Sequence, residues 1–236
     1  MQHPVVFLPG LMSDARAFEP LVAAFSVHVP VMVALPVGAE RIEEIASGII
    51  TSLPRRFNLV GHAMGGAVAM EIWRRAPDRV NRMVLMDTSP LAETPQTASD
   101  YEAAIIKLRA GRLDEAVEML MPRDALAPGE LRVHLMGLVH SMAAHLGAEA
   151  IIRQIRAVQR RRDHQSALRR CDIPVLVACG AYDRLTPVKR HELMADLIPD
   201  ARLRVFQGSG HLPMLEQPDE VLFELFEFFQ GAAAIS

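Results

Sequence analysis

The segment from Phe57 to Gly66 constrains the fold more than any other part of the chain. It begins as a short apolar run and then passes through the glycine-bracketed sequence Gly61-His-Ala-Met-Gly65. An apolar run that ends at glycine predicts a buried strand, and the residues from Ala67 to Arg75 have the composition of a helix. The sequence therefore predicts a strand that turns sharply into a helix, with Ala63 at the centre of the turn.

Composition limits the classes of protein to which the chain can belong. Its 236 residues suffice for one domain, or for one domain with an insertion. Half of the residues are hydrophobic and the formal net charge is −3, so the basic face of a nucleic-acid-binding protein is not expected. The sequence has no apolar run of the length that a membrane span needs, and its first residues do not resemble a signal peptide. Cys179 lies in an apolar run, which favours a buried thiol over a disulfide with Cys171 and indicates a cytoplasmic protein.

Strand and helix patterns alternate over the first 90 residues and again after residue 168. Such alternation predicts an α/β fold with a mostly parallel sheet of about six strands flanked by helices. Between them, from 91 to 168, apolar residues recur at helical spacing, and glycines and prolines divide the segment into about four short helices. We expect a core formed by 1–90 and 169–236, with 91–168 as a helical lid. The expected strands are 4–8, 27–35, 57–61, 80–86, 173–180 and 202–206; helices are expected at 15–25 and 40–53, among others.

Two further segments follow predicted strands, Gly180-Ala-Tyr-Asp183 and Gly208-Ser-Gly-His211. Loops that follow parallel strands meet at one edge of a sheet, where ligands bind. Asp183 and His211 should therefore converge on position 63. Asp87 also follows a strand and is the alternative carboxylate for His211, whereas Asp183 could instead cap the next helix.

These residue types fit nucleophilic catalysis of acyl transfer. A serine at position 63 would need the imidazole of His211 as its base, and a carboxylate to hold that imidazole in the correct tautomer. Attack of a serine on an acyl carbon produces a negatively charged oxygen, the oxyanion, which needs backbone N–H donors. We expect these donors to be Met64 and Leu11, the latter in the loop after the first strand. The predicted substrate contacts are Met12, Leu185 and Leu212; Ser13 is a less suitable nucleophile because no strained turn presents it. His62 is expected to have a structural role and to point away from the pocket.

Four motifs in order, Leu8-Pro-Gly10, Gly61-His-Ala-Met-Gly65, Gly180-Ala-Tyr-Asp183 and Gly208-Ser-Gly-His211, resemble the α/β-hydrolase superfamily. The resemblance extends over the whole chain and is closest to small lidded carboxylesterases, such as the pimeloyl-carrier-protein methyl ester esterases. It implies a hydrolase of small-molecule carboxylic esters with a Ser-His-Asp triad, and neither a metal nor another cofactor. It also identifies the Gly61–Gly65 turn as the nucleophile elbow, in which the family's serine is replaced by Ala63.

Ala63 has three possible interpretations. It can be a deliberate Ser-to-Ala change that inactivates an enzyme, or the mark of a natural pseudoenzyme that binds a small molecule. A third possibility is a lyase or cofactor-free oxygenase that needs only a His211–Asp183 dyad. The first interpretation is favoured because the other triad residues and the elbow glycines are all present.

A cluster of arginines occupies the end of the predicted lid. A solvated helix face is the ordinary interpretation of such a run. By analogy with the carrier-protein esterases, it could also be a docking patch for an acyl-carrier protein. Its members are Arg153, Arg156, Arg160, Arg161 and Arg162.

Overall fold

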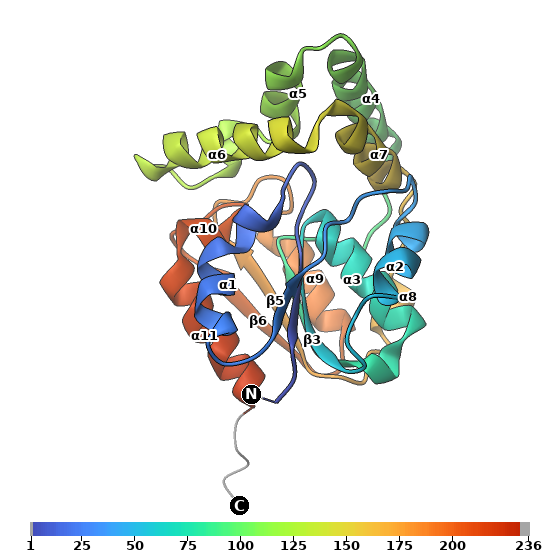
Figure 1. The fold of residues 1–236 in the computed structure, drawn as a ribbon, viewed down its shortest axis with the longest axis vertical. Helices are drawn as coiled ribbons and strands as arrows, with labels where there is room; N and C mark the ends of the chain where they lie inside the picture. Colours follow the sequence, from blue (N-terminus) through green and yellow to red (C-terminus); the bar gives the residue numbers. More distant parts are fainter. Residues whose placement is uncertain (1, 232–236) are drawn as a thin grey trace, which may run out of the picture.

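A computed structural model describes residues 2–231 and shows one six-stranded parallel sheet with strand order β2-β1-β3-β4-β5-β6 (Figure 1). The predicted α/β-hydrolase fold class and the number of strands are confirmed. All five strand pairings are parallel, so the loops that follow the strands lie at the same edge. The strands are β1 (Val5–Leu8), β2 (Val31–Val33), β3 (Phe57–His62), β4 (Val80–Met86), β5 (Val175–Gly180) and β6 (Ala201–Phe206).

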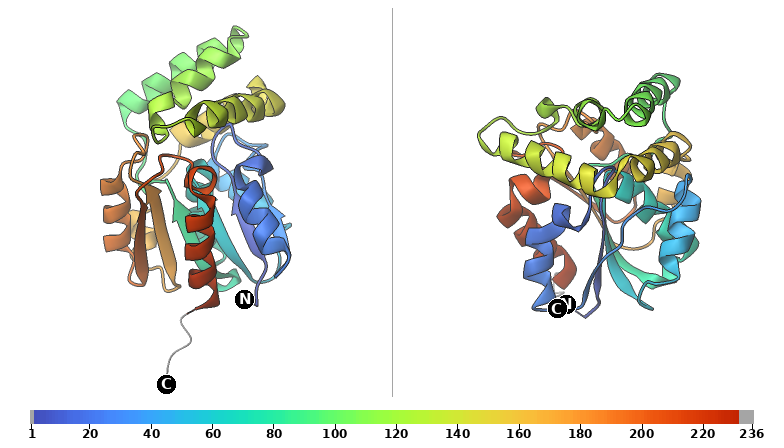
Figure 2. Two further views of the ribbon diagram at one scale, coloured as in Figure 1. Left: turned by 90° about the vertical axis from the view of Figure 1, so that its left-hand side faces the viewer. Right: turned by 45° about the horizontal axis from the view of Figure 1, so that its top comes forward.

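Helices cover both faces of this sheet, and alternate strand residues point to the two sides. In β1, Val5 and Phe7 pack on the side of α1 (Glu19–Ser26) and α11 (Pro218–Gln230), whereas Val6 and Leu8 pack on the other side. That second side is covered by α2 (Ile42–Ile50), α3 (Met64–Arg75) and α9 (Val188–Leu197). Figure 2 shows the two layers from other directions. All four residues of β1 are fully buried, which explains its continuous apolar sequence.

The second strand is shorter than the sequence indicates. We expected a strand over 27–35, but only Val31–Val33 forms one. The N–H groups of His28 and Val29 both bond to the carbonyl of Phe25, so these residues continue the turn at the end of α1. The helix expected over 15–25 is likewise divided into a 3₁₀ turn (Ala15–Phe18) and α1, with a proline at the start of α1.

The helices between residues 95 and 159 lie above the carboxyl ends of the strands (Figures 1 and 2). Gly111 and Gly147, at φ 72° and 79°, form two of the turns between them. We retain 91–168 as the proposed lid, although α8 (Gln165–Leu168) lies against α3 and α9 of the core. The main lid helices are α4 (Pro95–Arg109), α5 (Leu113–Leu120), α6 (Leu131–Leu146) and α7 (Ala148–Gln159).

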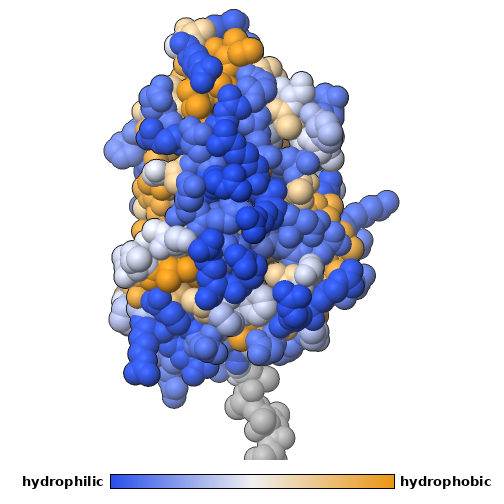
Figure 3. Space-filling view, turned by 90° about the vertical axis from the view of Figure 1, so that its right-hand side faces the viewer, coloured by the Kyte–Doolittle hydropathy of each residue, from blue (hydrophilic) through white to orange (hydrophobic). Residues whose placement is uncertain are grey.

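The face shown in Figure 3 is mostly hydrophilic, with apolar patches near the top and along the left side of the view. Exposed apolar residues in the lid include Ile106, Met119, Leu131 and Val133. No single helix in 2–231 has the length and apolar character to cross a membrane. Only α6 and α7 taken together meet those two criteria, and they are bent by 100°.

Candidate active site

Ala63 lies at the apex of a strained turn between β3 and α3. Its backbone angles, φ 49° and ψ −115°, lie outside the regions that a side chain normally permits, at a typical cost of about 1–3 kcal/mol. The flanking glycines make the turn possible, because a Cβ on Gly65 would lie 2.0 Å from the carbonyl oxygen of Leu8. A Cβ on Gly61 would lie 2.5 Å from the carbonyl oxygen of Gly65. The two glycines therefore allow the start of α3 to pack directly against β1 and β3.

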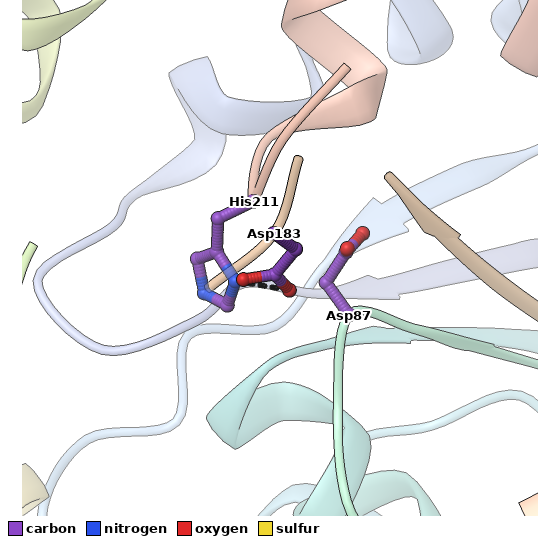
Figure 4. Close-up of side chains that lie close together, drawn as sticks. All are labelled: Asp87, Asp183 and His211. Atoms are coloured by element: carbon purple, nitrogen blue, oxygen red, sulfur yellow. Dashed lines mark hydrogen bonds and ion pairs between the residues drawn. The ribbon is translucent and has the colours of Figure 1, made fainter. Parts of the chain in front are cut away.

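His211 and Asp183 form a buried hydrogen-bonded pair beside this turn. The Nδ1 atom of His211 lies 2.9 Å from Oδ2 of Asp183 (Figure 4). Asp183 also accepts hydrogen bonds from the N–H groups of Leu185 and Thr186 and from the Thr186 hydroxyl. Burial alone would raise the pKa of Asp183, but the charge of His211 and these hydrogen bonds outweigh it and hold the pKa below its usual range. Asp183 is thus an ionised acceptor that fixes a proton on Nδ1 of His211.

Asp87, the alternative carboxylate, does not bond to the histidine. Its Oδ1 accepts the N–H of Gly180 at 3.0 Å, while its buried Oδ2 has no hydrogen-bond partner in 2–231. Burial, and then the negative charge of Asp183, raise the pKa of Asp87 well above its usual value. The two carboxyl groups and His211 are close enough to share a cation, but both oxygens of Asp183 already accept hydrogen bonds. A neutral Asp87 next to an ionised Asp183 accounts for this cluster.

The orientation expected for His62 is wrong, whereas its hydrogen bond agrees with the expected structural role. Its ring lies 4.9 Å from that of His211 and helps to line the cavity, instead of pointing away. Because its Nε2 lies 2.7 Å from the carbonyl oxygen of His211, Nε2 must carry a proton and donate it. Burial, and then the charge of His211, lower the pKa of His62 to about 3, so the ring is neutral. His62 therefore fastens the loop that carries His211 to the end of β3.

The two proposed oxyanion donors come from different loops, Leu11 from the loop after β1 and Met64 from the turn after β3. Met64 is the first residue of α3, so its N–H has no partner within the helix and lies at the positive end of the helix dipole. Leu11 follows Gly10 in the loop after β1, and its N–H makes no hydrogen bond within the described chain. Both residues line the same cavity as Ala63 and His211. Both N–H groups are therefore candidate donors to an oxygen atom bound in this cavity.

Thr88 holds the elbow through a hydrogen bond to its backbone, a role that the sequence did not predict. Its hydroxyl donates to the carbonyl oxygen of Ala63 at 2.7 Å, and its N–H donates to Nε2 of His191 at 3.0 Å. His191 is fully buried, and burial lowers its pKa to about 4, so it is a neutral acceptor. Thr88 follows β4, so the expectation that loops after parallel strands share one edge of the sheet, which identified Asp183, could also have identified Thr88. His191 lies within a helix and has no comparable signal.

A cavity of about 280 Å³ lies between the elbow and the lid. Met12, Leu185 and Leu212, the predicted substrate contacts, all line it, whereas Asp183 does not and lies behind His211. The lid supplies an apolar wall. Two cationic residues also line the cavity: Arg161, which the sequence placed only in the arginine cluster, and Arg190, which it did not single out. The apolar lid residues are Met119, Leu120, Met121, Val139 and Val158.

The arginine cluster of the lid is largely paired with acids. Docking of a carrier protein stays a prediction, and these ion pairs reduce the charge available for it. The pairs are Arg156–Glu102, Arg160–Glu40 at 2.8 Å, Arg161–Glu93 at 2.8 Å and Arg162–Glu43 at 2.5 Å.

Comparison with known proteins agrees with the geometry. The chain is 29% identical over 213 residues to the pimeloyl-[acyl-carrier protein] methyl ester esterase of Aromatoleum aromaticum, covering 83% of each chain. It is 24% identical over 224 residues to a candidate carbamate hydrolase, RutD, of Yersinia enterocolitica, covering 88% of this chain and 80% of that one. The fold matches a thermophilic esterase from Thermogutta terrifontis with a TM-score of 0.87 and 22% identity, covering 98% of this chain and 90% of the other. The model of the Alpha/beta hydrolase family matches residues 5–225, and the chain belongs to this family.

Proposed function

We propose that this protein is a serine-type carboxylic ester hydrolase from which the nucleophilic hydroxyl has been removed at Ala63. One observation carries the proposal: a non-glycine residue occupies a strained turn beside an assembled His211–Asp183 pair. Nothing in ordinary packing requires alanine at φ 49°. The strain has a purpose if the turn presents a reactive side chain to the cavity.

With serine at position 63, each remaining group has a role. Nε2 of His211, the ring nitrogen that Asp183 leaves free, takes the hydroxyl proton as the serine oxygen bonds to the ester carbon. The N–H groups of Leu11 and Met64 stabilise the negative oxygen of the tetrahedral intermediate. His211 then protonates the departing alcohol, and a water molecule, activated by the same histidine, hydrolyses the acyl-serine to the acid.

The chain with Ala63 keeps the cavity, the base and the oxyanion donors but cannot form the acyl-enzyme. Removal of a triad serine typically lowers kcat by roughly a million-fold. Binding of the substrate need not change, because alanine differs from serine by one oxygen atom. We infer that this chain is an inactive form that can still bind the substrate.

Several relatives bear names that match this chemistry. The relative from Aromatoleum aromaticum is named for a methyl ester, and the one from Yersinia enterocolitica for a carbamate. Both bonds join an acyl carbon to a leaving group, and both can pass through a tetrahedral intermediate. The ester is favoured because the 29% identical relative is an esterase.

The experiment is to restore serine with Ala63→Ser and measure the hydrolysis of p-nitrophenyl acetate and butyrate. The restored protein should exceed the Ala63 chain by at least a thousand-fold in kcat/KM, and His211→Ala in the restored protein should remove the gain. Equal and negligible rates would contradict the proposal and favour a binding protein. An active Ala63 chain that loses its activity with His211→Ala would instead support the dyad chemistry.

A further inference from the structure

Two guanidinium groups meet the same residue, Ser89, in the wall of the cavity. Nη1 of Arg161 lies 3.4 Å from the Ser89 carbonyl oxygen, and Nη1 of Arg190 lies 3.4 Å from the Ser89 hydroxyl. Ser89 is buried and follows Thr88, whose hydroxyl bonds to the carbonyl of Ala63. Ser89 and Thr88 therefore connect these two guanidinium groups to Ala63 at the elbow.

The acids of the cavity leave Arg190 without a partner. Arg161 is committed to Glu93 at 2.8 Å, and the side chains of this pair are only 11% and 10% exposed. Asp100, the other lining carboxylate that could balance a cation here, is exposed and accepts a hydrogen bond from the Gln96 amide. No carboxylate of the described residues lies within ion-pair distance of Arg190.

Two neutral hydroxyl groups line the same cavity as this cation. The Ser89 hydroxyl can donate to an anion, and the phenol of the half-buried Tyr101 also lines the cavity. Burial raises the pKa of Tyr101 to about 12, so its hydroxyl keeps its proton at neutral pH. An unpaired guanidinium next to the Ser89 hydroxyl matches a carboxylate, which accepts through two oxygens.

We propose that the substrate is an ester that carries a free carboxylate, and that Arg190 binds this carboxylate while the ester group lies at the elbow. This inference rests on the proposed ester hydrolysis and names the substrate class of the same site. Arg161 contributes less, because Glu93 already uses its charge. The apolar lid residues then contact the carbon chain between the two ends.

Binding to the Ala63 chain tests the inference without turnover. Monomethyl adipate and methyl hexanoate have the same chain length and differ in the terminal carboxylate. Calorimetry should show monomethyl adipate binding at least ten-fold more tightly than methyl hexanoate. The variant Arg190→Gln should weaken binding of monomethyl adipate by about ten- to hundred-fold, the range for loss of a charge-assisted hydrogen bond, and leave methyl hexanoate unchanged.

Matched variants separate the site from the general charge of the helix. Arg190→Lys should retain most of the preference because it keeps the cation. Lys189→Gln removes the same charge from the neighbouring, exposed position of α9 and should change nothing. Equal losses in Lys189→Gln and Arg190→Gln would overturn the inference, because the effect would then come from the general charge of the helix.

A second pair of esters identifies the side of the ester that carries the carboxylate. Here 5-acetoxypentanoate, with the carboxylate on the alcohol side, is compared with pentyl acetate. An Arg190-dependent preference in either pair supports the inference, and its absence from both refutes it.

If Ala63→Ser hydrolyses methyl hexanoate but shows no preference for carboxylates, the proposed function stands and this inference fails. If the Ala63 chain binds monomethyl adipate through Arg190 while Ala63→Ser stays inactive, only the proposed function fails.

Discussion

The side chain of Gln154 in the lid accepts a hydrogen bond from the backbone N–H of Met12, beside the proposed oxyanion donor Leu11. The distance from the Met12 nitrogen to Oε1 of Gln154 is 3.1 Å, and the two residues are 142 positions apart in the sequence. Nε2 of Gln154 donates to the carbonyl of Pro36 at 3.3 Å, and the side chain is fully buried. Met12 has the unusual φ of 61°. Helix α7 thus holds the loop after β1 in a conformation that it would not adopt readily by itself.

Replacing Gln154 with leucine should impair catalysis more than binding. In the Ala63→Ser background, Gln154→Leu should lower kcat by about ten-fold or more with little change in KM. The reason is that a displaced Leu11 N–H weakens the stabilisation of the transition state. The buried Met12 N–H would also lose its acceptor, which should lower the free energy of unfolding by about 1–3 kcal/mol. Steady-state kinetics and urea unfolding measure the two effects.

Gln159→Leu is the control for this prediction. Gln159 lies on the same helix, but its Nε2 bonds to Ala98 and Glu102 of α4, within the lid. It should affect stability without a specific loss of kcat. Similar kinetic losses in both variants would show that Gln154 acts only by holding the lid in place.

Substitution of Asp87 should reveal its protonation state. Its pKa is raised in the folded protein, so folding binds a proton at pH values above the ordinary aspartate pKa of about 3.9. Asp87 therefore opposes folding increasingly as the pH rises from that value towards its folded pKa, by about 1.4 kcal/mol per pH unit. Asp87→Asn, which can still accept the Gly180 N–H, should be more stable than the unaltered chain at pH 8 and equally stable at pH 3.5.

Urea unfolding at several pH values between 3.5 and 8 tests this difference. A destabilisation that is the same at every pH would mean that Asp87 is ionised or that the amide does not fit. The stability contribution of Asp183 changes with pH in the opposite direction, because the pKa of this residue is lowered in the folded protein. Its contribution to stability should be present above about pH 3.9 and be lost as the pH falls below that value.

The backbone strain at Ala63 should be measurable as a change in the free energy of unfolding when glycine replaces alanine. Ala63→Gly removes the conflict between a Cβ and φ 49°, which typically costs about 1–3 kcal/mol, but adds about 0.4–1 kcal/mol of unfolded-state entropy. We expect a net gain of about 1 kcal/mol in the free energy of unfolding. The same change at Ala67, one turn into α3 and buried, should instead destabilise the protein by about 1 kcal/mol or more. A loss at both positions would contradict a strained elbow.

Sequence reasoning located the elbow and brought Asp183 and His211 together, because loops after parallel strands must share an edge. It could not identify Gln154 or Arg190, since each lies within a helix whose placement above the sheet depends on the whole fold. The error at His62 has a similar cause: its neighbour in space, the carbonyl of His211, is 149 residues away. The second strand was predicted too long because apolar residues near Val27 extend a helical turn and do not all enter the sheet.

The most direct test of the central claim is covalent labelling of the residue at the elbow. We would treat the Ala63→Ser protein with diisopropyl fluorophosphate and digest it. Mass spectrometry should find one peptide that carries a diisopropylphosphoryl group, on the residue at position 63. The Ala63 chain should give none, and His211→Ala in the restored protein should slow labelling by at least a hundred-fold. Absence of an adduct from the restored protein, or an adduct on Ser13 in both proteins, would contradict the account.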